Sequence, residues 1–213
     1  MYRVKEIYYT LQGEGFHTGR PAVFLRFAGC NLWSGYEEDR AQAICNFCDT
    51  DFVGTDGPGG GEFASAPDLA QAVESVWRSS ANRSVISQFV VCTGGEPLLQ
   101  LDHALVDGLH ECGFEIAIET NGTCAPPDGI DWLCVSPKAG AKRVIDEGDE
   151  LKLIFPDKGN EPDKYEQLQF DHFYLQPMDG PRRDENTQLA LEYCLRRPQW
   201  RLSLQTQKLL GIP

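Results

Sequence analysis

Three of the chain's eight cysteines, Cys30, Cys45 and Cys48, lie in one stretch, RFAGCNLWSGYEEDRAQAICNFCDTDF, which contains no histidine. A structural zinc site closes with four Cys or His ligands, and the nearest histidine, His17, stands thirteen residues before Cys30. A four-cysteine ferredoxin site lacks its fourth thiolate in the same way. Three thiolates on a cubane iron–sulphur cluster leave one iron free to chelate a small molecule. We interpret the missing ligand as a functional opening; three buried apolar thiols are the alternative.

The composition limits the possible partners. The chain of 213 residues fits one large domain or two small ones, and 41% of it is hydrophobic. The sequence shows no signal-peptide-like start and no apolar run of membrane-spanning length, so we expect a cytoplasmic protein with reduced cysteines and no membrane partner. Its formal net charge of −13 argues against direct binding to nucleic acid, because that binding depends on Lys and Arg that neutralise phosphates. A small-molecule partner fits better.

Strand-like and helix-like segments alternate along the chain. Apolar runs that predict strands span 22–27, 88–93, 114–120, 131–136, 150–155, 172–177 and 200–205. Helical spacing of apolar residues marks 66–80, 101–113 and 186–197. This rhythm predicts a largely parallel sheet with helical crossovers.

Two segments depart from that rhythm. The ten residues 121–130 contain two prolines and cannot supply a normal helix, so we expect an α/β open or incomplete barrel with some helices missing. The glycine-rich stretch 54–63 predicts a flexible surface loop. In parallel sheets the chemistry sits at the carboxyl ends of the strands, and the candidate residues fall there.

The cysteine segment resembles that of radical S-adenosylmethionine enzymes, whose usual pattern is Cys-x3-Cys-x2-Cys after the first barrel strand. It follows AVFLRFAG directly, an aromatic residue (Phe47) precedes its last cysteine, and TGGEP (93–97) ends the next strand. The first gap is the departure, with fourteen residues instead of three. We expect one domain over 1–213, with a cluster-loop insertion at 31–44 whose helical part, GYEEDRAQA, returns the chain to Cys30.

Further motifs resemble one family. They are YTLQGEG (9–15), GRPAVFLRFAGCNLW (19–33), CDTDF (48–52), CTGGEPLLQ (92–100), IETNG (118–122), VSPK (135–138), LQPMDG (175–180) and LSLQTQKLLGIP (202–213). In this order they are similar to the 7-carboxy-7-deazaguanine synthases, and among these to the bacterial members with the long cysteine gap. The resemblance runs from Tyr9 to Pro213.

The resemblance implies the activity. Members convert 6-carboxy-5,6,7,8-tetrahydropterin to 7-carboxy-7-deazaguanine with loss of ammonia, on the pathway to 7-deazapurines such as queuosine in tRNA. A [4Fe-4S] cluster reduces S-adenosylmethionine, the resulting radical takes hydrogen from C6 of the substrate, and the hydrogen later returns. The resemblance also implies Mg2+, a homodimer, and a flavodoxin- or ferredoxin-type electron donor.

It further implies the roles of individual residues. The cluster ligands are Cys30, Cys45 and Cys48, and the magnesium ligand is Thr50. The residues expected at S-adenosylmethionine are Phe47, Asp49, Gly95, Ser136, Pro137, Lys138, Gln176, Pro177, Met178 and Asp179. The residues expected at the substrate are Leu11, Gln12, Gly13, Glu14, Arg26, Thr93 and Pro213. Outside the family context, Thr50 is a turn or cap residue, Arg26 a surface strand-end residue, and Gly-Gly-Glu-Pro only a turn signal.

The chemistry of these residue types agrees with such roles. A carboxylate at Glu14 accepts from adjacent N–H donors of a pterin edge, and Arg26 offers a forked donor for a carboxylate. Gln207 departs from the family, where related bacterial sequences have His; glutamine cannot titrate, which puts proton transfer there in doubt. We expect Leu209, Leu210 and Ile212 to pack the tail over the mouth of the sheet, so that the Pro213 carboxylate reaches the substrate.

Two other classes remain as alternatives. One is another radical S-adenosylmethionine enzyme such as a glycyl-radical activase, which YTLQGEG and LQTQK disfavour. The other is a zinc-stabilised binding module without enzymatic activity. The remaining cysteines we interpret as core residues. They are Cys92, Cys112, Cys124, Cys134 and Cys194.

Overall fold

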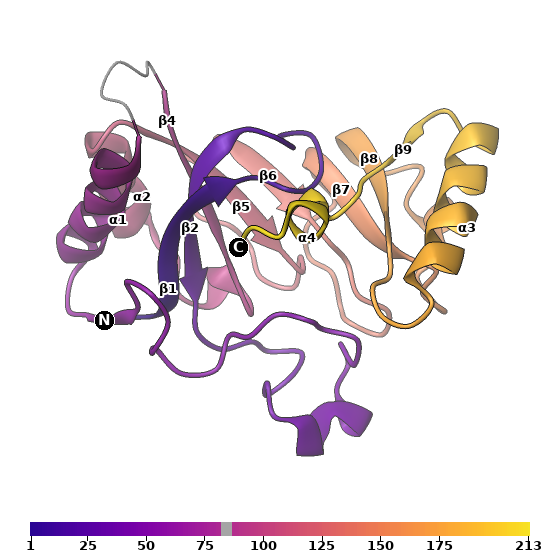
Figure 1. The fold of residues 1–213 in the computed structure, drawn as a ribbon, viewed down its shortest axis with the longest axis horizontal. Coiled ribbons are helices and arrows are strands. Elements are labelled where there is room, and N and C mark those ends of the chain that lie inside the picture. The colour runs from indigo at the N-terminus through magenta and orange to yellow at the C-terminus, as the bar shows by residue number, and fades with distance from the viewer. Residues whose placement is uncertain (82–86) are drawn as a thin grey trace.

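The structure is a computed structural model that describes residues 1–81 and 87–213 (Figure 1). Its strands are β1 (Tyr2–Leu11), β2 (Pro21–Phe27), β3 (Gly61–Phe63), β4 (Gln88–Gly94), β5 (Phe114–Thr120), β6 (Trp132–Val135), β7 (Glu147–Phe155), β8 (Gln169–Pro177) and β9 (Trp200–Leu202). Its α-helices are α1 (Ala66–Ser80), α2 (His103–Glu111), α3 (Arg183–Arg196) and α4 (Thr206–Leu210). Its 3-10 helices are η1 (Glu37–Gln42), η2 (Pro97–Leu99) and η3 (Pro162–Lys164).

One sheet of nine strands organises the molecule, in the order β3-β1-β2-β4-β5-β6-β7-β8-β9. From β2 to β9 neighbouring strands are parallel, whereas β1 pairs antiparallel with both β2 and β3. The sheet does not close, because β3 and β9 are its two ends. The predicted open α/β barrel is therefore confirmed.

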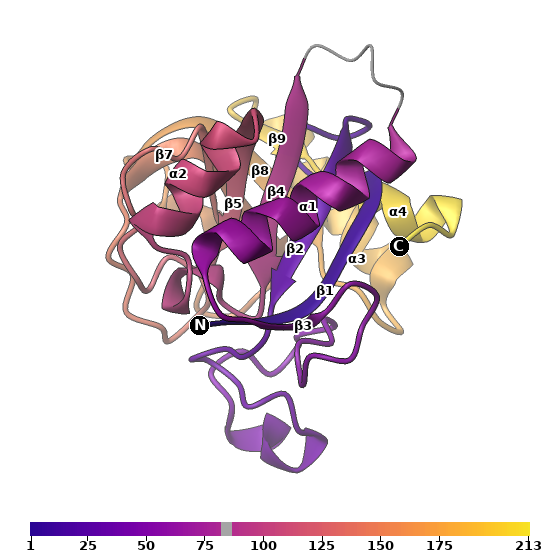
Figure 2. The same cartoon turned by 90° about the vertical axis from the view of Figure 1, so that its left-hand side faces the viewer.

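Helices cover the convex face of the sheet in two groups. Figures 1 and 2 show α1 and α2 side by side at one end of the sheet and α3 at the other. Val73 and Trp77 of α1 and Leu105 and Leu109 of α2 are buried against the first group of strands, as the sequence pattern predicts. No helix follows β5 or β6 in the described chain, so the middle of the barrel wall lacks its outer layer.

The parallel strands alternate between this helical face and the interior. In β7, Leu151 and Leu153 are fully buried in the core beneath α3, while Lys152 lies between them and faces the interior. In β5, Ile118 is buried toward the helices and Glu119 toward the interior. Successive side chains of a strand point to opposite faces. When the apolar residues pack against the helices, the charged residues between them therefore face the interior.

Some predicted elements differ from the observed ones. The sequence analysis missed β1, since a register shift between Val4 and Glu6 breaks its alternation of apolar and polar residues. It was wrong that all of 54–63 is loop, because Gly61–Phe63 pairs with β1 as an edge strand. The third helix begins at Arg183, earlier than the predicted 186. The helical segment predicted at 35–43 is present as the 3-10 helix η1, which lies away from the sheet in Figure 2.

The prediction of five core cysteines is only partly right. Cys92 and Cys134 are buried in strands, whereas the other three are half-buried because they lie in a cap, a loop and an outer helix. Those three are Cys112, Cys124 and Cys194. Over residues 1–81 and 87–213, no helix has the length and apolarity needed to cross a membrane.

Candidate active site

A cavity of about 390 Å³ opens at the carboxyl ends of the parallel strands. Every residue that the sequence analysis assigned to the cluster, cofactor, magnesium or substrate lines it, except Pro137. Pro137 is buried and its carbonyl accepts a hydrogen bond of 2.9 Å from Asn160 Nδ2, which anchors the VSPK loop beside the cavity. The structure therefore brings together segments from both ends of the chain.

The three cysteines lie at one end of this cavity. Cys30 follows β2, and its Sγ accepts the Leu32 N–H at 3.4 Å. The Cys45 thiol, which hydrogen-bonds to Cys48, and the Thr50 N–H lower the pKa of Cys48 to about 6, although burial opposes this. Burial raises the pKa of Cys30. At least one thiol of the set is therefore readily ionised, as a soft-metal ligand must be.

This donor set fits an iron–sulphur cluster better than a single ion. Among the described side chains, no group of three His, Cys, Asp or Glu is gathered closely enough to hold one metal ion. Thiolates bound to different irons of a cluster stand farther apart than ligands of one ion. The described residues that line the cavity include these three Cys but no His and no fourth Cys, which matches a cubane cluster with one iron left without a protein ligand.

The Gly-Gly-Glu-Pro segment fixes the cysteine end of the cavity. A Cβ on Gly95 would lie 2.1 Å from the Gly29 carbonyl oxygen and 2.7 Å from Cys30 Cβ, so only glycine permits this approach. Glu96 is fully buried and accepts from Thr120 Oγ1 at 2.7 Å and from the Asn121 N–H at 2.8 Å. The segment is thus more than a turn, because it locks the ends of β4 and β5 together.

A buried ion-pair network forms the other end. Lys152 Nζ lies 2.7 Å from Glu14 Oε2 and 3.2 Å from Glu119 Oε1. Gln12 Nε2 also donates to Glu119, at 3.1 Å. Burial raises the pKa of Glu14, but Lys152, Gln205 and Gln207 outweigh it and lower the pKa to about 2. Glu14 is therefore a carboxylate throughout the physiological range.

Arg26 is already engaged in this structure. Its Nε pairs with Glu6 Oε1 at 2.7 Å and its Nη2 donates to Tyr8 Oη at 2.7 Å. These contacts orient the guanidinium over the cavity from β2 and β1. Since arginine carries five N–H donors, further donors remain for a ligand.

The loops after β6 and β8 are fixed by local hydrogen bonds. Lys138 Nζ donates to the carbonyl and the hydroxyl of Ser136, at 2.6 and 2.7 Å, and burial lowers its pKa. Asn186, in the first turns of α3, donates to the Met178 carbonyl at 2.8 Å. Both loops therefore present cofactor candidates on a supported backbone.

The C-terminal segment crosses the cavity through polar contacts. Thr206 donates to the Gly13 carbonyl through its N–H (3.0 Å), and both Gln205 and Gln207 donate to Glu14 Oε1 at 3.0 Å. Pro213 lines the cavity, and its O accepts from Thr10 Oγ1 at 3.0 Å.

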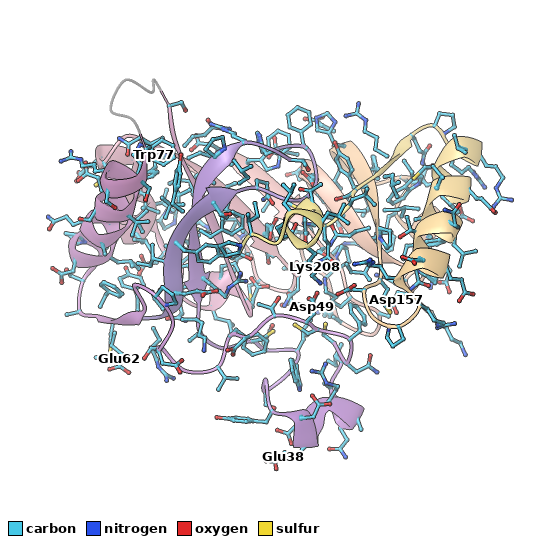
Figure 3. The ribbon with its side chains drawn as sticks, in the orientation of Figure 1. Glu38, Asp49, Glu62, Trp77, Asp157 and Lys208 are labelled. Atoms are coloured by element: carbon cyan, nitrogen blue, oxygen red, sulfur yellow. The ribbon has the colours of Figure 1, made fainter. Side chains whose placement is uncertain are left out.

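Lys208 holds the same segment to the cysteine end. Its Nζ pairs with Asp49, and with Asp179 at 2.6 Å; Figure 3 shows Lys208 and Asp49 facing each other below α4. The prediction that Leu209, Leu210 and Ile212 pack this tail was wrong for both leucines, which are each 64% exposed, whereas Ile212 is half-buried. The polar side of the short helix α4 faces the cavity, and the ion pairs of Lys208 hold the C-terminal segment in place.

Several cavity residues were missed from the sequence. They are Glu119, Lys152, Gln205 and Lys208. A usable signal existed for the first two, since a charged residue inside an apolar strand must be paired when buried. The other two carry no such signal, because polar residues in a polar segment need no buried partner, and Glu14 and Asp49 lie 191 and 159 residues away from Gln205 and Lys208.

An open, largely parallel sheet with three cysteines at the carboxyl ends of its strands defines a partial barrel of the radical S-adenosylmethionine type. Comparisons with known proteins agree. The chain is 61% identical over 212 residues to the 7-carboxy-7-deazaguanine synthase of Caulobacter vibrioides, and 59% identical over 212 residues to that of Burkholderia multivorans. Each match covers 100% of this chain and 99% of the relative. The chain belongs to the 7-carboxy-7-deazaguanine synthase family.

The fold gives the same result. The crystal structure of QueE from Escherichia coli superimposes with a TM-score of 0.66 at 27% identity, covering 95% of this chain and 93% of that one. No family model matches the chain. Family membership decides against the zinc-stabilised module and the glycyl-radical activase.

The network around Lys152 gives a first prediction. Lys152→Met leaves the half-buried carboxylates of Glu14 and Glu119 without their buried cation, and should lower the free energy of unfolding by roughly 3 kcal/mol at neutral pH. The pKa of Glu14 is about 2, below its ordinary 4.5, so its ionised form stabilises the protein above pH 4.5, and that stability disappears as the pH falls toward 2. The defect should therefore shrink in acid, measured by urea unfolding at several pH values.

The control for that experiment is Lys164→Met, which removes an exposed pair with Glu161 and an exposed hydrogen bond to the Gly159 carbonyl. It should leave the unfolding curve unchanged. Equal stability of the Lys152 variant and the wild type would show that the network contributes nothing.

Lys208 gives a second prediction. Lys208→Ala releases α4 from Asp49 and Asp179, so carboxypeptidase should digest the tail faster. Because the pairs are partly exposed, the KM for substrate should rise only about three- to tenfold. Lys158→Ala, on the loop after β7, serves as the control. A tail digested at the wild-type rate would contradict the assignment.

Proposed function

We propose that this chain converts 6-carboxy-5,6,7,8-tetrahydropterin to 7-carboxy-7-deazaguanine with loss of ammonia. The observation that carries the proposal is the single cavity of about 390 Å³, with three cysteines at one end and the buried Glu14–Lys152–Glu119 network at the other. A reaction that joins an iron–sulphur cofactor to a polar heterocycle needs both ends in one enclosure. The names of the relatives point to the same product.

The network end suits the pterin. A carboxylate offers about four acceptor sites, and Glu14 uses three of them on Lys152, Gln205 and Gln207, which leaves one for a substrate N–H. The unused N–H groups of Arg26 face the same space and match the substrate carboxylate. Glu14 would thus hold the N–H edge of the pterin ring, and Arg26 would hold the edge that bears the carboxylate. The remaining substrate contacts proposed are Leu11, Gln12, Gly13, Thr93 and Pro213.

The cysteine end suits the cofactors. Cys30, Cys45 and Cys48 would hold a [4Fe-4S] cluster, which together with S-adenosylmethionine supplies the radical that starts the rearrangement. Lys138, a buried cation near the thiols, suits the carboxylate of the methionine group. The other proposed contacts of S-adenosylmethionine are Phe47, Asp49, Gly95, Ser136, Pro137, Gln176, Pro177, Met178 and Asp179.

Thr50 is the proposed magnesium ligand. It follows Cys48-Asp49 and lines the cavity. Magnesium keeps several waters and binds through few protein oxygens together with substrate oxygens, so one hydroxyl suffices.

Family membership supports four broader proposals. The product enters 7-deazapurine synthesis such as that of queuosine, a flavodoxin- or ferredoxin-type protein donates electrons, the enzyme works in the cytoplasm, and the chain forms a homodimer. We also propose that residues 1–213 form one catalytic domain with the cluster-loop insertion at 31–44; the continuous nine-stranded sheet supports this.

The direct test is anaerobic turnover of the carboxy-tetrahydropterin after reconstitution with iron and sulphide, with the product identified by mass. Replacing any one of Cys30, Cys45 and Cys48 with Ala should abolish both the cluster and turnover. Cys112→Ala, outside the cavity lining, should keep both. A Cys45→Ala enzyme that still binds four irons and forms product would refute the ligand assignment.

A separate test concerns magnesium. Chelation of divalent cations should slow turnover, and added Mg2+ should restore it, because the metal aligns substrate oxygens. Thr50→Val should raise the Mg2+ concentration needed for half-maximal rate while leaving the iron content unchanged. Full activity of thoroughly metal-stripped enzyme would argue against Thr50 as a ligand.

The chain terminus provides a further test. A C-terminal tag moves the free carboxylate away from Pro213, so it should raise the KM for the pterin while the iron content stays at the wild-type value. An N-terminal tag is the matched control, since Met1 is 82% exposed and does not line the cavity. Identical kinetic constants for the two tagged forms would remove Pro213 from the site.

A further inference from the structure

The insertion between Cys30 and Cys45 folds around one side chain, Arg40. The insertion contains η1 and lies away from the sheet, with Glu38 at its tip (Figure 3). Its two ends meet, because the N–H groups of Ile44 and Cys45 donate to the Leu32 carbonyl at 3.1 and 3.4 Å. The fourteen-residue gap is therefore a closed loop that returns Cys45 to the vicinity of Cys30.

Arg40 reaches from η1 into the Cys-x-x-Cys motif itself. A single nitrogen, Nη1, donates to the carbonyl oxygens of Asn46 at 3.1 Å and Cys48 at 3.0 Å. The two carbonyl oxygens converge on one nitrogen, and Asn46 and Phe47 lie in a turn, so the segment from Asn46 to Cys48 is bent. That bend sets the direction in which the Cys48 side chain leaves the backbone.

The guanidinium is itself held from two other directions. Its Nε pairs with Glu37 Oε2 at 2.7 Å, and its Cζ lies 4.1 Å from the centre of the Trp33 ring. Trp33 is buried, packs edge-on against Phe52, and donates from Nε1 to the Tyr36 carbonyl at 3.1 Å. The arginine side chain is consequently only 28% exposed despite lying on a protruding loop.

We propose that Arg40 is a positioning residue for the iron–sulphur cluster. Arg40 lies within the long Cys30–Cys45 insertion and fixes the backbone of the Cys-x-x-Cys motif through its hydrogen bonds. Its guanidinium also places a positive charge next to the three thiolates. The inference rests on the proposed function, since it requires a cluster at Cys30, Cys45 and Cys48.

The geometry requires arginine in particular. A planar guanidinium can stack on Trp33 while its edge donates to two carbonyls and one carboxylate. A lysine ammonium keeps the charge but cannot combine stacking with donation in fixed directions. Substitution by lysine therefore separates the effect of charge from that of geometry.

The experiment compares Arg40→Met, Arg40→Lys and Glu37→Gln with the wild type, all reconstituted anaerobically with iron and sulphide. The measurements are iron per chain, the rate of cluster loss to an iron chelator, the reduction potential of the cluster, and the melting temperature of the cluster-free protein. Arg40→Met should lose its cluster about 10- to 100-fold faster than the wild type, the range typical of residues that orient metal ligands. Arg40→Lys should also lose it faster but keep a potential closer to that of the wild type.

Glu37→Gln removes one support of the Arg40 guanidinium and should increase the rate of cluster loss by a smaller factor. If Arg40→Met does not fold, this variant tests the role of Arg40 instead. Arg78→Met, which removes an exposed arginine paired with Glu74 on α1, is the matched control and should behave as the wild type. Loss rates and potentials equal to the wild type in all three test variants would overturn the role of Arg40. The role would also be overturned if the cluster-free variants melted at a temperature low enough for general unfolding to explain their faster loss of the cluster. A wild-type chain that takes up no cluster would instead refute the proposed function.

Discussion

The buried ammonium of Lys152 between two carboxylates is the interaction on which the site depends. It joins Glu14, from the loop after β1, to Glu119 of β5, and lies on β7, so one cation connects three parts of the sheet. Burying these charges is costly, and their attraction offsets the cost only with close geometry and further hydrogen bonds. Gln12, Gln205 and Gln207 supply those bonds.

The apolar face of the same strands makes that burial possible. Leu151 and Leu153 on β7, and Ile116 and Ile118 on β5, are fully buried on the helical side. Each such side chain contributes about 1.5–3 kcal/mol when removed from water. The apolar face of these strands, which packs against the helices, thus stabilises the sheet. The opposite face of the same strands can therefore bear the charged side chains that line the cavity.

The C-terminal segment connects the two ends of the cavity. Its glutamines bind Glu14 at the network end, and Lys208 binds Asp49 and Asp179 at the cysteine end. One short segment that contains α4, a helix of five residues, therefore contacts both ends. Gln207 fits this structural role, because an amide donates to the Glu14 carboxylate without a proton that titrates near neutral pH. Arg40 makes comparable contacts near the cysteines, since it donates to the carbonyl oxygens of Asn46 and Cys48.

Local patterns in the sequence determined the parallel strands β2 and β4 to β9, the main helices and the segments that carry chemistry, but not β1 or β3, because side-chain periodicity and cysteine spacing are properties of neighbouring residues. Apolar runs predicted β5 and most of β7, helical spacing predicted α1 and α2, and the prolines of 121–130 predicted a missing helix. Pairing between distant residues could not be derived this way. The edge strand β3 exists only because it pairs with β1, and the partners of Lys152 lie 138 and 33 residues away. Only the tertiary structure could show that Lys208, rather than the exposed leucines, holds the C-terminal tail. The partners of Lys208, Asp49 and Asp179, lie in loops that follow different strands, and the sheet brings these loops together.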